Sequence, residues 1–261
     1  MEELQIRSID GITLDACVHR STKPISRGTV VQAHGISADM DEGGMFVRLA
    51  DRLAEAGLSA VRFSFRGHGK SGGTQRGMTI AGEMLDLNAV IDYTVDQLPG
   101  RLAIVAASFG AVSACLSLPL IEHRVEALVL WNPVLDLQRT FVNPQTPWAM
   151  RNFSPRAVAA LADTGYLLLD GAFQVGGVLY HEMRAHDPLA AFMSSGVPSL
   201  IIHGDADSYV PYSVAAEAAD ARGCDFFTIT GSDHGFDGRQ NEDTAIEETV
   251  RWLDVRFGST R

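Results

Sequence analysis

Short apolar runs of strand length alternate, along most of this chain, with stretches whose apolar residues recur at helical spacing. After the N-terminal segment, the expected strands cover 29–33, 59–65, 102–106, 125–131, 198–203 and 225–230. The expected helices cover 46–55, 84–98, the stretch from 109 onward, 213–221 and 246–257. Repeated strand–helix units predict an α/β fold with a mainly parallel sheet and helices on both of its faces. A chain of 261 residues fits one such unit.

The first residues follow a different pattern. Residues 4–9 and 12–18 each alternate apolar and polar side chains, and Asp10-Gly11 separates them. Asp-Gly between two alternating runs is a strong signal for a hairpin. We therefore expect an antiparallel pair of strands ahead of the parallel part of the sheet.

The alternation of strands and helices stops after residue 132 and resumes at about 188. The segment between is rich in aromatic residues, namely Phe141, Trp148, Phe153, Tyr166, Phe173 and Tyr180. So many aromatic residues are not typical of a disordered linker. We predict that residues 133–187 form an inserted cap of short helices or hairpins, and that residues 1–132 with 188–261 form the core.

Composition excludes several classes of function. The formal net charge of −11, without any basic block, argues against nucleic acid or an anionic membrane as a partner. Cys17, Cys115 and Cys224 are widely spaced, and His181 and His186 do not share a helical face, so we expect no metal site and no cofactor. The first residues lack signal-peptide features, and no apolar run approaches the ~18 residues of a membrane span. A cytoplasmic protein is the expectation.

A glycine-rich loop follows the expected strand 59–65 and contains Gly69-Lys70-Ser71. These residues resemble the end of a phosphate-binding loop. That motif requires a glycine five residues before Gly69, where this chain has Ser64, and a helix afterwards, where this chain has more glycines. We therefore expect no phosphate site here.

Ala106-Ala107-Ser108-Phe109-Gly110 joins an expected strand to an expected helix. Small residues two positions either side of a serine are typical of a sharp turn that exposes the hydroxyl above a sheet. The pentapeptide alone fits equally well a serine in an ordinary loop, and its first small residue is alanine where the motif has glycine.

Acids and bases follow later strands. Serine needs a general base to act as a nucleophile, and functional groups of parallel sheets gather at the carboxyl ends of the strands. Asp205 and Asp207 follow the strand that ends at His203, and His234 follows the last strand. The order serine, aspartate, histidine matches the catalytic triad of α/β-hydrolases, with either aspartate able to serve as the acid. His68 and His123 are expected to be ordinary loop residues.

These motifs together resemble the α/β-hydrolase superfamily over nearly the whole chain. The pieces that carry the resemblance are His34-Gly35, residues 65–71, 106–110, 203–211 and 231–235. Met78-Thr79, Glu83, Asp86 and the cap resemble, more narrowly, the bacterial feruloyl/cinnamoyl esterase-like group. The resemblance implies an eight-stranded sheet. One departure is Ser64, where the family often has an acidic residue.

The resemblance also implies roles for individual residues. Ser108 is the nucleophile, His234 the general base, and Asp207 the acid that orients the imidazole, which leaves Asp205 to bind backbone groups. The backbone N–H groups of Ile36 and Phe109 form the oxyanion hole. Substrate contacts are expected from His34, Trp148 and Tyr209.

A serine nucleophile excludes the branches of this fold that act on halides or epoxides through aspartate. The leading hypothesis is hydrolysis of a carboxylic ester, with an apolar or aromatic acyl group, through an acyl-enzyme. A thioesterase or acyltransferase would use the same triad, and the basic residues Arg139, Arg151, Arg156 and Arg184 leave it open. A non-catalytic ligand receptor is disfavoured because serine, aspartate and histidine are all present. The expected partner is a small ester or thioester, and a homodimer is compatible with the sequence.

Overall fold

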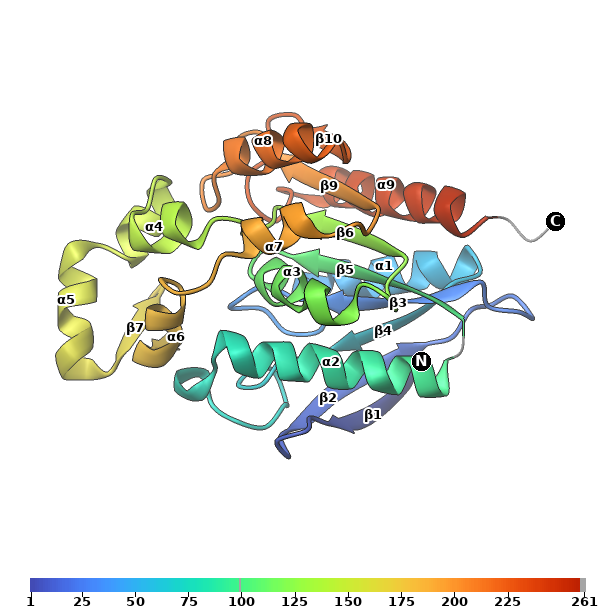
Figure 1. The fold of residues 1–261 in the computed structure, drawn as a ribbon, viewed down its shortest axis with the longest axis horizontal. Helices are drawn as coiled ribbons and strands as arrows, with labels where there is room; N and C mark the ends of the chain where they lie inside the picture. The colour runs from blue at the N-terminus through green and yellow to red at the C-terminus, as the bar shows by residue number, and fades with distance from the viewer. Residues whose placement is uncertain (99, 259–261) are drawn as a thin grey trace.

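An eight-stranded sheet runs through the computed structural model, which describes residues 1–98 and 100–258 (Figure 1). Its strands are β1 (Glu2–Arg7), β2 (Thr13–His19), β3 (Gly28–Ala33), β4 (Ser59–Phe63), β5 (Arg101–Ala107), β6 (Ala127–Trp131), β9 (Ser199–Gly204) and β10 (Asp225–Ile229). Their order in the sheet is β1-β2-β4-β3-β5-β6-β9-β10. β2 pairs antiparallel with β1 and β4, and the other pairs are parallel. The predicted fold class is confirmed.

The antiparallel pair at the N-terminus closes where the sequence predicts. The N–H of Gly11 donates to the carbonyl of Ser8 at 2.8 Å, and the N–H of Ser8 donates to that of Ile12 at 2.8 Å. Gly11 has a φ of 90°, which glycine adopts without steric cost. The register sets Ile6 opposite Leu14, and both side chains are buried. Alternation of apolar and polar residues therefore decides which face of the hairpin meets the core.

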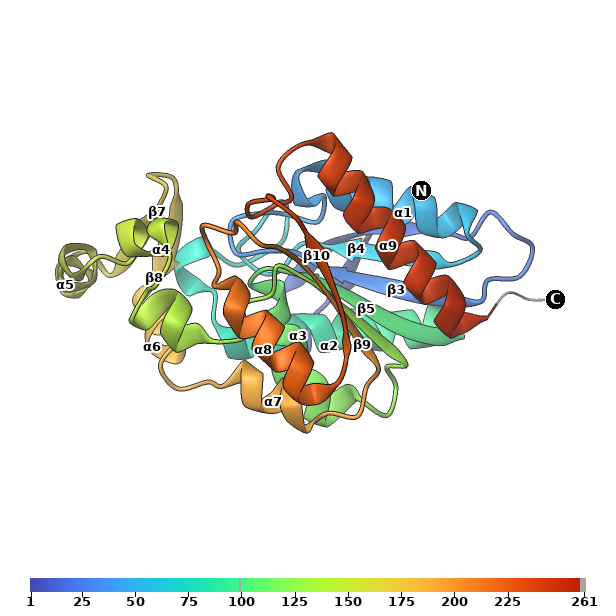
Figure 2. The same ribbon diagram turned by 90° about the horizontal axis from the view of Figure 1, so that it is seen from above.

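Helices cover both faces of the sheet (Figure 2). The helices of the core are α1 (Met45–Glu55), α2 (Ile80–Gln97), α3 (Gly110–Ile121), α7 (Pro188–Ser194), α8 (Tyr212–Arg222) and α9 (Arg239–Phe257). Short 3-10 turns form at η1 (Glu42–Gly44) and η2 (Gln75–Gly77). α1 and α9 pack on one face, and α2, α3, α7 and α8 pack on the other.

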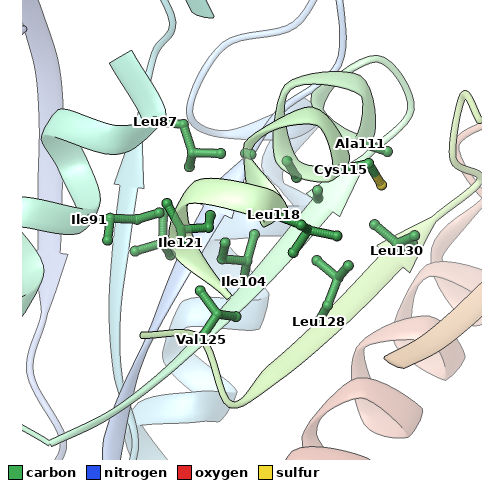
Figure 3. Close-up of a cluster of buried hydrophobic side chains, with 14 of the residues drawn as sticks. Leu87, Ile91, Ile104, Ala111, Cys115, Leu118, Ile121, Val125, Leu128 and Leu130 are labelled. Carbon is green, nitrogen blue, oxygen red and sulfur yellow. The ribbon is translucent and has the colours of Figure 1, made fainter. Parts of the chain in front are cut away.

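Helix α3 lies in the middle of its layer and is buried on almost every side. Figure 3 shows Leu87 and Ile91 of α2, Ile104 of β5 and Leu128 of β6 around Leu118 of α3. Each fully buried side chain of this kind contributes roughly 1.5–3 kcal/mol of transfer free energy. Dense packing therefore fixes α3, and with it the turn that precedes its first residue.

Residues 133–187, the segment predicted as a cap, lie together at one end of the sheet (Figures 1 and 2). They form η3 (Gln138–Val142), α4 (Pro147–Asn152), α5 (Pro155–Thr164), β7 (Tyr166–Leu169), β8 (Phe173–Gly176) and α6 (Gly177–Glu182). β7 and β8 make an antiparallel hairpin. We keep the name cap for this segment.

The aromatic residues of the cap pack mainly against one another. Phe141 and Phe153 have ring centroids 4.9 Å apart, and both are buried. The same apolar cluster includes Trp148 and several residues from outside the cap, among them Ile36 and Phe109. The cap therefore has a core of its own that is continuous with the end of the sheet.

Two helices begin earlier than their apolar spacing predicts. α2 begins at Ile80 because polar groups bind its first N–H groups: the Thr79 hydroxyl accepts from Gly82 and the Glu182 carboxylate accepts from Ile80 at 2.6 Å. α9 begins at Arg239, and its first turns are charged and half-exposed, so they carry no apolar stripe. Pro99, predicted to end a helix, lies outside the described residues. Within the described residues, no helix is long and apolar enough to cross a membrane.

Candidate active site

Ser108 stands between β5 and α3 in a strained backbone conformation. Its φ is +49°, which a side chain with a Cβ rarely adopts. The Ser108 N–H donates to the carbonyl of Trp131 at 2.8 Å, and the Ser108 carbonyl accepts from Val134 at 3.0 Å. These contacts hold the turn, and the hydroxyl projects from the end of the sheet toward His234. Strain of this kind occurs at functional sites.

The second small residue of the pentapeptide, Gly110, is required because backbone atoms lie very close to it. A Cβ atom at this position would lie 2.5 Å from the carbonyl oxygen of Ala33 and 2.6 Å from that of His34. Both neighbours are backbone atoms, so only glycine fits. Ala106, in contrast, is fully buried in the apolar core of the α2–α3 face, where alanine fits without a glycine requirement.

His234 links the serine to an aspartate. Its Nε2 atom lies 3.0 Å from Ser108 Oγ, and its Nδ1 atom lies 2.8 Å from Asp207 Oδ2. His234 comes from the loop after β10 and Asp207 from the loop after β9. The structure thus brings together three residues that are far apart in the sequence but follow the carboxyl ends of parallel strands.

The two candidate aspartates have different partners. Asp207 Oδ1 accepts from the N–H groups of Tyr209 and Val210, each at 2.8 Å, while its Oδ2 faces His234. Asp205 accepts from the N–H of Gly231 at 2.6 Å and is exposed. Only Asp207 can orient the imidazole in this arrangement, and Asp205 joins two loops.

Burial and neighbouring charges together determine the protonation of His234 and Asp207. Burial opposes a charge on His234, but the Asp207 carboxylate outweighs it and raises the pKa of the imidazole. Burial would likewise raise the pKa of Asp207, but His234 and the hydrogen bond from His203 hold it well below its usual range. Asp207 therefore stays ionised, and His234 is a base strong enough to take a proton from a hydroxyl.

The loop after β3 lies beside the serine. A Cβ atom on Gly35 would lie 3.2 Å from Ser108 Cβ, so the backbone passes very close to the hydroxyl. Within residues 1–98 and 100–258, the N–H groups of Ile36 and Phe109 donate no hydrogen bond. Two free N–H groups near one hydroxyl are what an oxyanion hole requires.

His34 and His68 support this loop from behind. The Phe65 N–H donates to His34 Nε2 at 2.9 Å, and His34 Nδ1 donates to the Gly35 carbonyl at 2.8 Å. Burial lowers the pKa of both imidazoles, so both are neutral. His34, expected to contact substrate, is 1% exposed and does not line the chamber at Ser108. His68, expected to be an ordinary loop residue, is buried, and its Nε2 donates to the Ile36 carbonyl at 2.6 Å.

Comparison with known proteins shows the family of the chain. The profile of the family described as Serine aminopeptidase, S33, matches residues 24–173, more than half of the chain. The chain belongs to this family of α/β-hydrolases. No curated protein matches the whole sequence of this hydrolase closely enough to be counted a relative.

Solved structures show the same fold. Est1E from Butyrivibrio proteoclasticus, with ferulic acid bound, has a TM-score of 0.83 and 22% identity, over 98% of this hydrolase and 100% of that chain. The esterase Pf2001 of Pyrococcus furiosus has a TM-score of 0.75 and 19% identity, over 98% and 91%. Alpha/beta hydrolase domain-containing protein 10 from mouse has 0.76 and 18%, over 98% and 99%.

A small apolar chamber of the hydrolase opens at Ser108 and His234. Its volume is about 60 Å³, and its walls are Gly35, Ile36, Ser37, Ala38, Phe141, Trp148, Tyr209 and Val210. The Tyr209 ring stacks on His234 at 4.8 Å and on Trp148 at 4.7 Å. The structure thus places two of the three predicted substrate contacts on the chamber wall, and the cap closes it.

A second hollow of the hydrolase, of about 520 Å³, shares Ser37 and Ala38 with the chamber. Asp39 and Asp41 line it, together with glycines and the polar side chain of Gln75. Among the described residues that line it there is no lysine or arginine. The hollow is therefore more polar than the chamber, although His68 and Phe173 also line it.

Three residues of the site in this hydrolase were not assigned roles from the sequence. His203 donates from Nε2 to Asp207 Oδ2 at 3.0 Å, and its i,i+4 spacing from Asp207 was the available signal. Asp233 accepts from the Ser208 N–H at 2.6 Å and fixes the histidine loop against the aspartate loop. Glu42 accepts from the Gly35 N–H at 2.7 Å, and nothing in the sequence distinguishes it from a surface glutamate.

Proposed function

We propose that this hydrolase cleaves carboxylic esters through an acyl-enzyme, with Ser108 as nucleophile, His234 as general base and Asp207 as the orienting acid. The observation that carries the proposal is the hydrogen-bonded series Ser108–His234–Asp207 beside two backbone N–H groups that donate to nothing in the described part of the chain. The strained φ of Ser108 supports it, since a loop serine without a chemical role needs no such conformation.

The steps follow from the geometry. Ser108 Oγ attacks the ester carbonyl carbon while its proton passes to His234 Nε2. The carbonyl oxygen becomes an oxyanion and accepts from the N–H groups of Ile36 and Phe109. The intermediate collapses, and the alcohol leaves with the proton from His234. Water then attacks the acyl-enzyme with His234 again as base, which releases the acid and restores Ser108.

The chamber and the hollow suit different parts of an ester. The apolar chamber would hold the acyl group, and the polar hollow would hold the alcohol. A chamber of about 60 Å³ accepts a short apolar acyl group directly. An aromatic acyl group requires the Trp148 and Tyr209 rings to move aside.

The charge of the hollow weighs against a thioesterase acting on coenzyme A. A leaving group that carries several phosphates would meet the carboxylate of Asp39, while Asp41 is paired with Arg62, and no lysine or arginine stands among the described lining residues to bind a phosphate. Two of the arginines in or near the cap that would favour a thioesterase or acyltransferase already have partners: Arg139 pairs with Glu217, and Arg184 lies over the Tyr180 ring. Neutral or cationic alcohols suit the hollow better than polyanionic thiols.

A panel of acyl donors tests the proposal. Acetyl, butyryl and cinnamoyl esters, acyl-coenzyme A thioesters and an aminoacyl anilide are assayed with the wild type and with Ser108→Ala. We expect turnover of short esters by the wild type and none by Ser108→Ala. Turnover of the anilide or thioester alone, or full activity of Ser108→Ala, would overturn the proposal.

A further inference from the structure

Three side chains hold the Gly35-Ile36 loop by its backbone. The Gly35 carbonyl accepts from His34, the Ile36 carbonyl accepts from His68, and the Gly35 N–H donates to Glu42 Oε2. Among the backbone N–H and C=O groups of Gly35 and Ile36, only the N–H of Ile36 has no hydrogen-bond partner in the described part of the chain. The loop is therefore fixed on every side except the one that faces Ser108.

Glu42 differs from the two histidines because it can carry charge next to the reacting groups. A Cβ atom on Gly35 would lie 3.7 Å from Glu42 Oε2 and 3.7 Å from Ser108 Oγ, so both groups lie on one side of Gly35. The charged and titratable groups that face the Glu42 carboxyl are His234, which favours its ionised form, and Asp39, which disfavours it.

The backbone at Glu42 is also unusual. Its φ is +46°, in the left-handed region, although it is not a glycine. The turn is held by Asp41, whose carbonyl accepts from Gly44 and Phe46 and whose carboxylate pairs with the buried Arg62. A non-glycine residue in this region is strained and is retained where the surrounding structure requires it.

We propose that Glu42 is a positioning residue for ester cleavage: its side chain holds the loop that presents the Ile36 N–H, and its negative charge supports the His234 imidazolium. This inference depends on the proposed function, because it assigns Glu42 to the same reaction. Asp207 orients the imidazole from Nδ1, and Glu42 acts from the side of the oxyanion loop.

The two effects of Glu42 separate with pH. Burial raises the pKa of Glu42 to about 7, against the lowering effects of the Gly35 hydrogen bond and of His234. Below that pH the neutral acid can still accept from Gly35, but the charge beside His234 is lost. Burial opposes the charge on His234, but the ionised Glu42 carboxylate favours it and so raises the pKa of His234, which should hold the acid limb of log kcat/KM against pH at a higher pH than an uncharged side chain would.

Glu42→Gln and Glu42→Ala test the two effects, with Glu55→Gln on the exposed face of α1 as matched control. Glutamine keeps an acceptor for Gly35 without the charge, and alanine removes both. We expect Glu42→Ala to lower kcat by about tenfold, a fraction of the 10²–10³ lost with a whole oxyanion donor, with KM little changed. Glu42→Gln should recover most of kcat and shift the acid limb of log kcat/KM to lower pH.

Each result bears on the proposal. Unchanged kcat in Glu42→Ala, a loss expressed only in KM, or an acid limb of Glu42→Gln at the same pH as that of the wild type would overturn it. If Glu42→Ala does not fold, the pH profile of Glu42→Gln decides. The pH dependence of a second reaction is measured for the wild type and the Glu42 variants: the rate at which a fluorophosphonate phosphonylates Ser108, in which the Oγ–P bond forms and fluoride leaves.

The phosphonylation assay separates this inference from the proposed function. Wild type that is phosphonylated but hydrolyses no ester would overturn the ester assignment and still test Glu42 through the labelling rate. Wild type that reacts with neither the esters nor the fluorophosphonate would overturn both, because Ser108 would then not be an activated nucleophile.

Discussion

Asp205 and Asp207 stand two positions apart in one loop and contact different partners, which makes them a matched pair for mutation. Asp207→Asn removes the charge that faces His234 Nδ1, and loss of this charge in a triad lowers kcat by about 10⁴. Asp205→Asn keeps an oxygen for the Gly231 N–H and should leave kcat close to that of the wild type. Steady-state assays on the best ester compare the two variants, and a larger loss at 205 would contradict the assignment.

Ser108 allows a test of stored backbone strain. Its φ of +49° costs a residue with a Cβ about 1–2 kcal/mol, whereas glycine adopts it freely. Ser108→Gly should therefore be more stable than Ser108→Ala, by about 1 kcal/mol after the entropy of the unfolded glycine is allowed for. Urea unfolding of both inactive variants measures the difference. Equal midpoints would mean that the turn stores no strain.

At the scale of residues, positions that belong to a pattern could be predicted, and positions that depend on contacts could not. Ser108, Asp207 and His234 were predicted because each comes after a strand in a known order, and the structure brings them together. The predicted contact of His34 with substrate does not fit the structure, because the sequence His-Gly after a strand does not determine the direction of the imidazole ring, and this ring points into the protein. Glu42 could not be predicted, since its contact with Gly35 depends on the turn between them.

Among the elements, the cap supplies Phe141 and Trp148 to the wall of the apolar chamber at Ser108. Trp148 stacks on Tyr209, and both line the chamber. Trp148→Ala should enlarge it, so kcat/KM for cinnamoyl esters should rise relative to acetyl esters. The variant also loses a buried aromatic residue, which costs roughly 3–5 kcal/mol of stability.

The measurement is the ratio of kcat/KM for the cinnamoyl ester to kcat/KM for the acetyl ester, because this ratio does not depend on the fraction of enzyme that is folded. Val178→Ala, an exposed change elsewhere in the cap, is the control. A cinnamoyl-to-acetyl ratio that is unchanged in Trp148→Ala would show that the chamber does not hold the acyl group.

The elements themselves were largely predictable, because the core alternates short buried strands with helices that have an apolar stripe. The strands β3, β5, β9 and β10 agree with prediction to within a residue or so at each end. The start of α9 was not predictable from apolar spacing, because its first turn is held by an ion pair between Glu242 and Arg48. The cap was predicted as a segment but not element by element, since no periodicity runs through it.

For the whole molecule, the buried Glu83 predicts how stability changes with pH. Glu83 is 1% exposed and accepts from the Ser113 hydroxyl at 2.8 Å, and burial raises its pKa from 4.5 to about 8. The native state therefore keeps a proton that the unfolded state loses above pH 4.5. Between pH 4.5 and about 8 this group lowers the stability by ~1.4 kcal/mol per pH unit.

Glu83→Gln keeps the neutral form at every pH. Its free energy of unfolding relative to wild type should increase between pH 5 and pH 8, as measured by urea denaturation at both values. Glu126→Gln, in an exposed ion pair with Arg101, is the control and should show little change. If the free energy of unfolding of Glu83→Gln relative to wild type is the same at both pH values, Glu83 is ionised in the native state.

The chain leaves the sheet after β6 and returns to it as β9, and these two strands are neighbours in the sheet. Because β6 and β9 run parallel, the chain leaves at the carboxyl end of β6 and returns to the amino end of β9, and α7 completes this crossover after the cap. Doubling the length of such an insertion costs only about 0.6 kcal/mol of closure entropy. The cap is thus an insertion within one crossover, and Ser108, Asp207 and His234 all lie outside it, so its length and lining can change without moving these three residues.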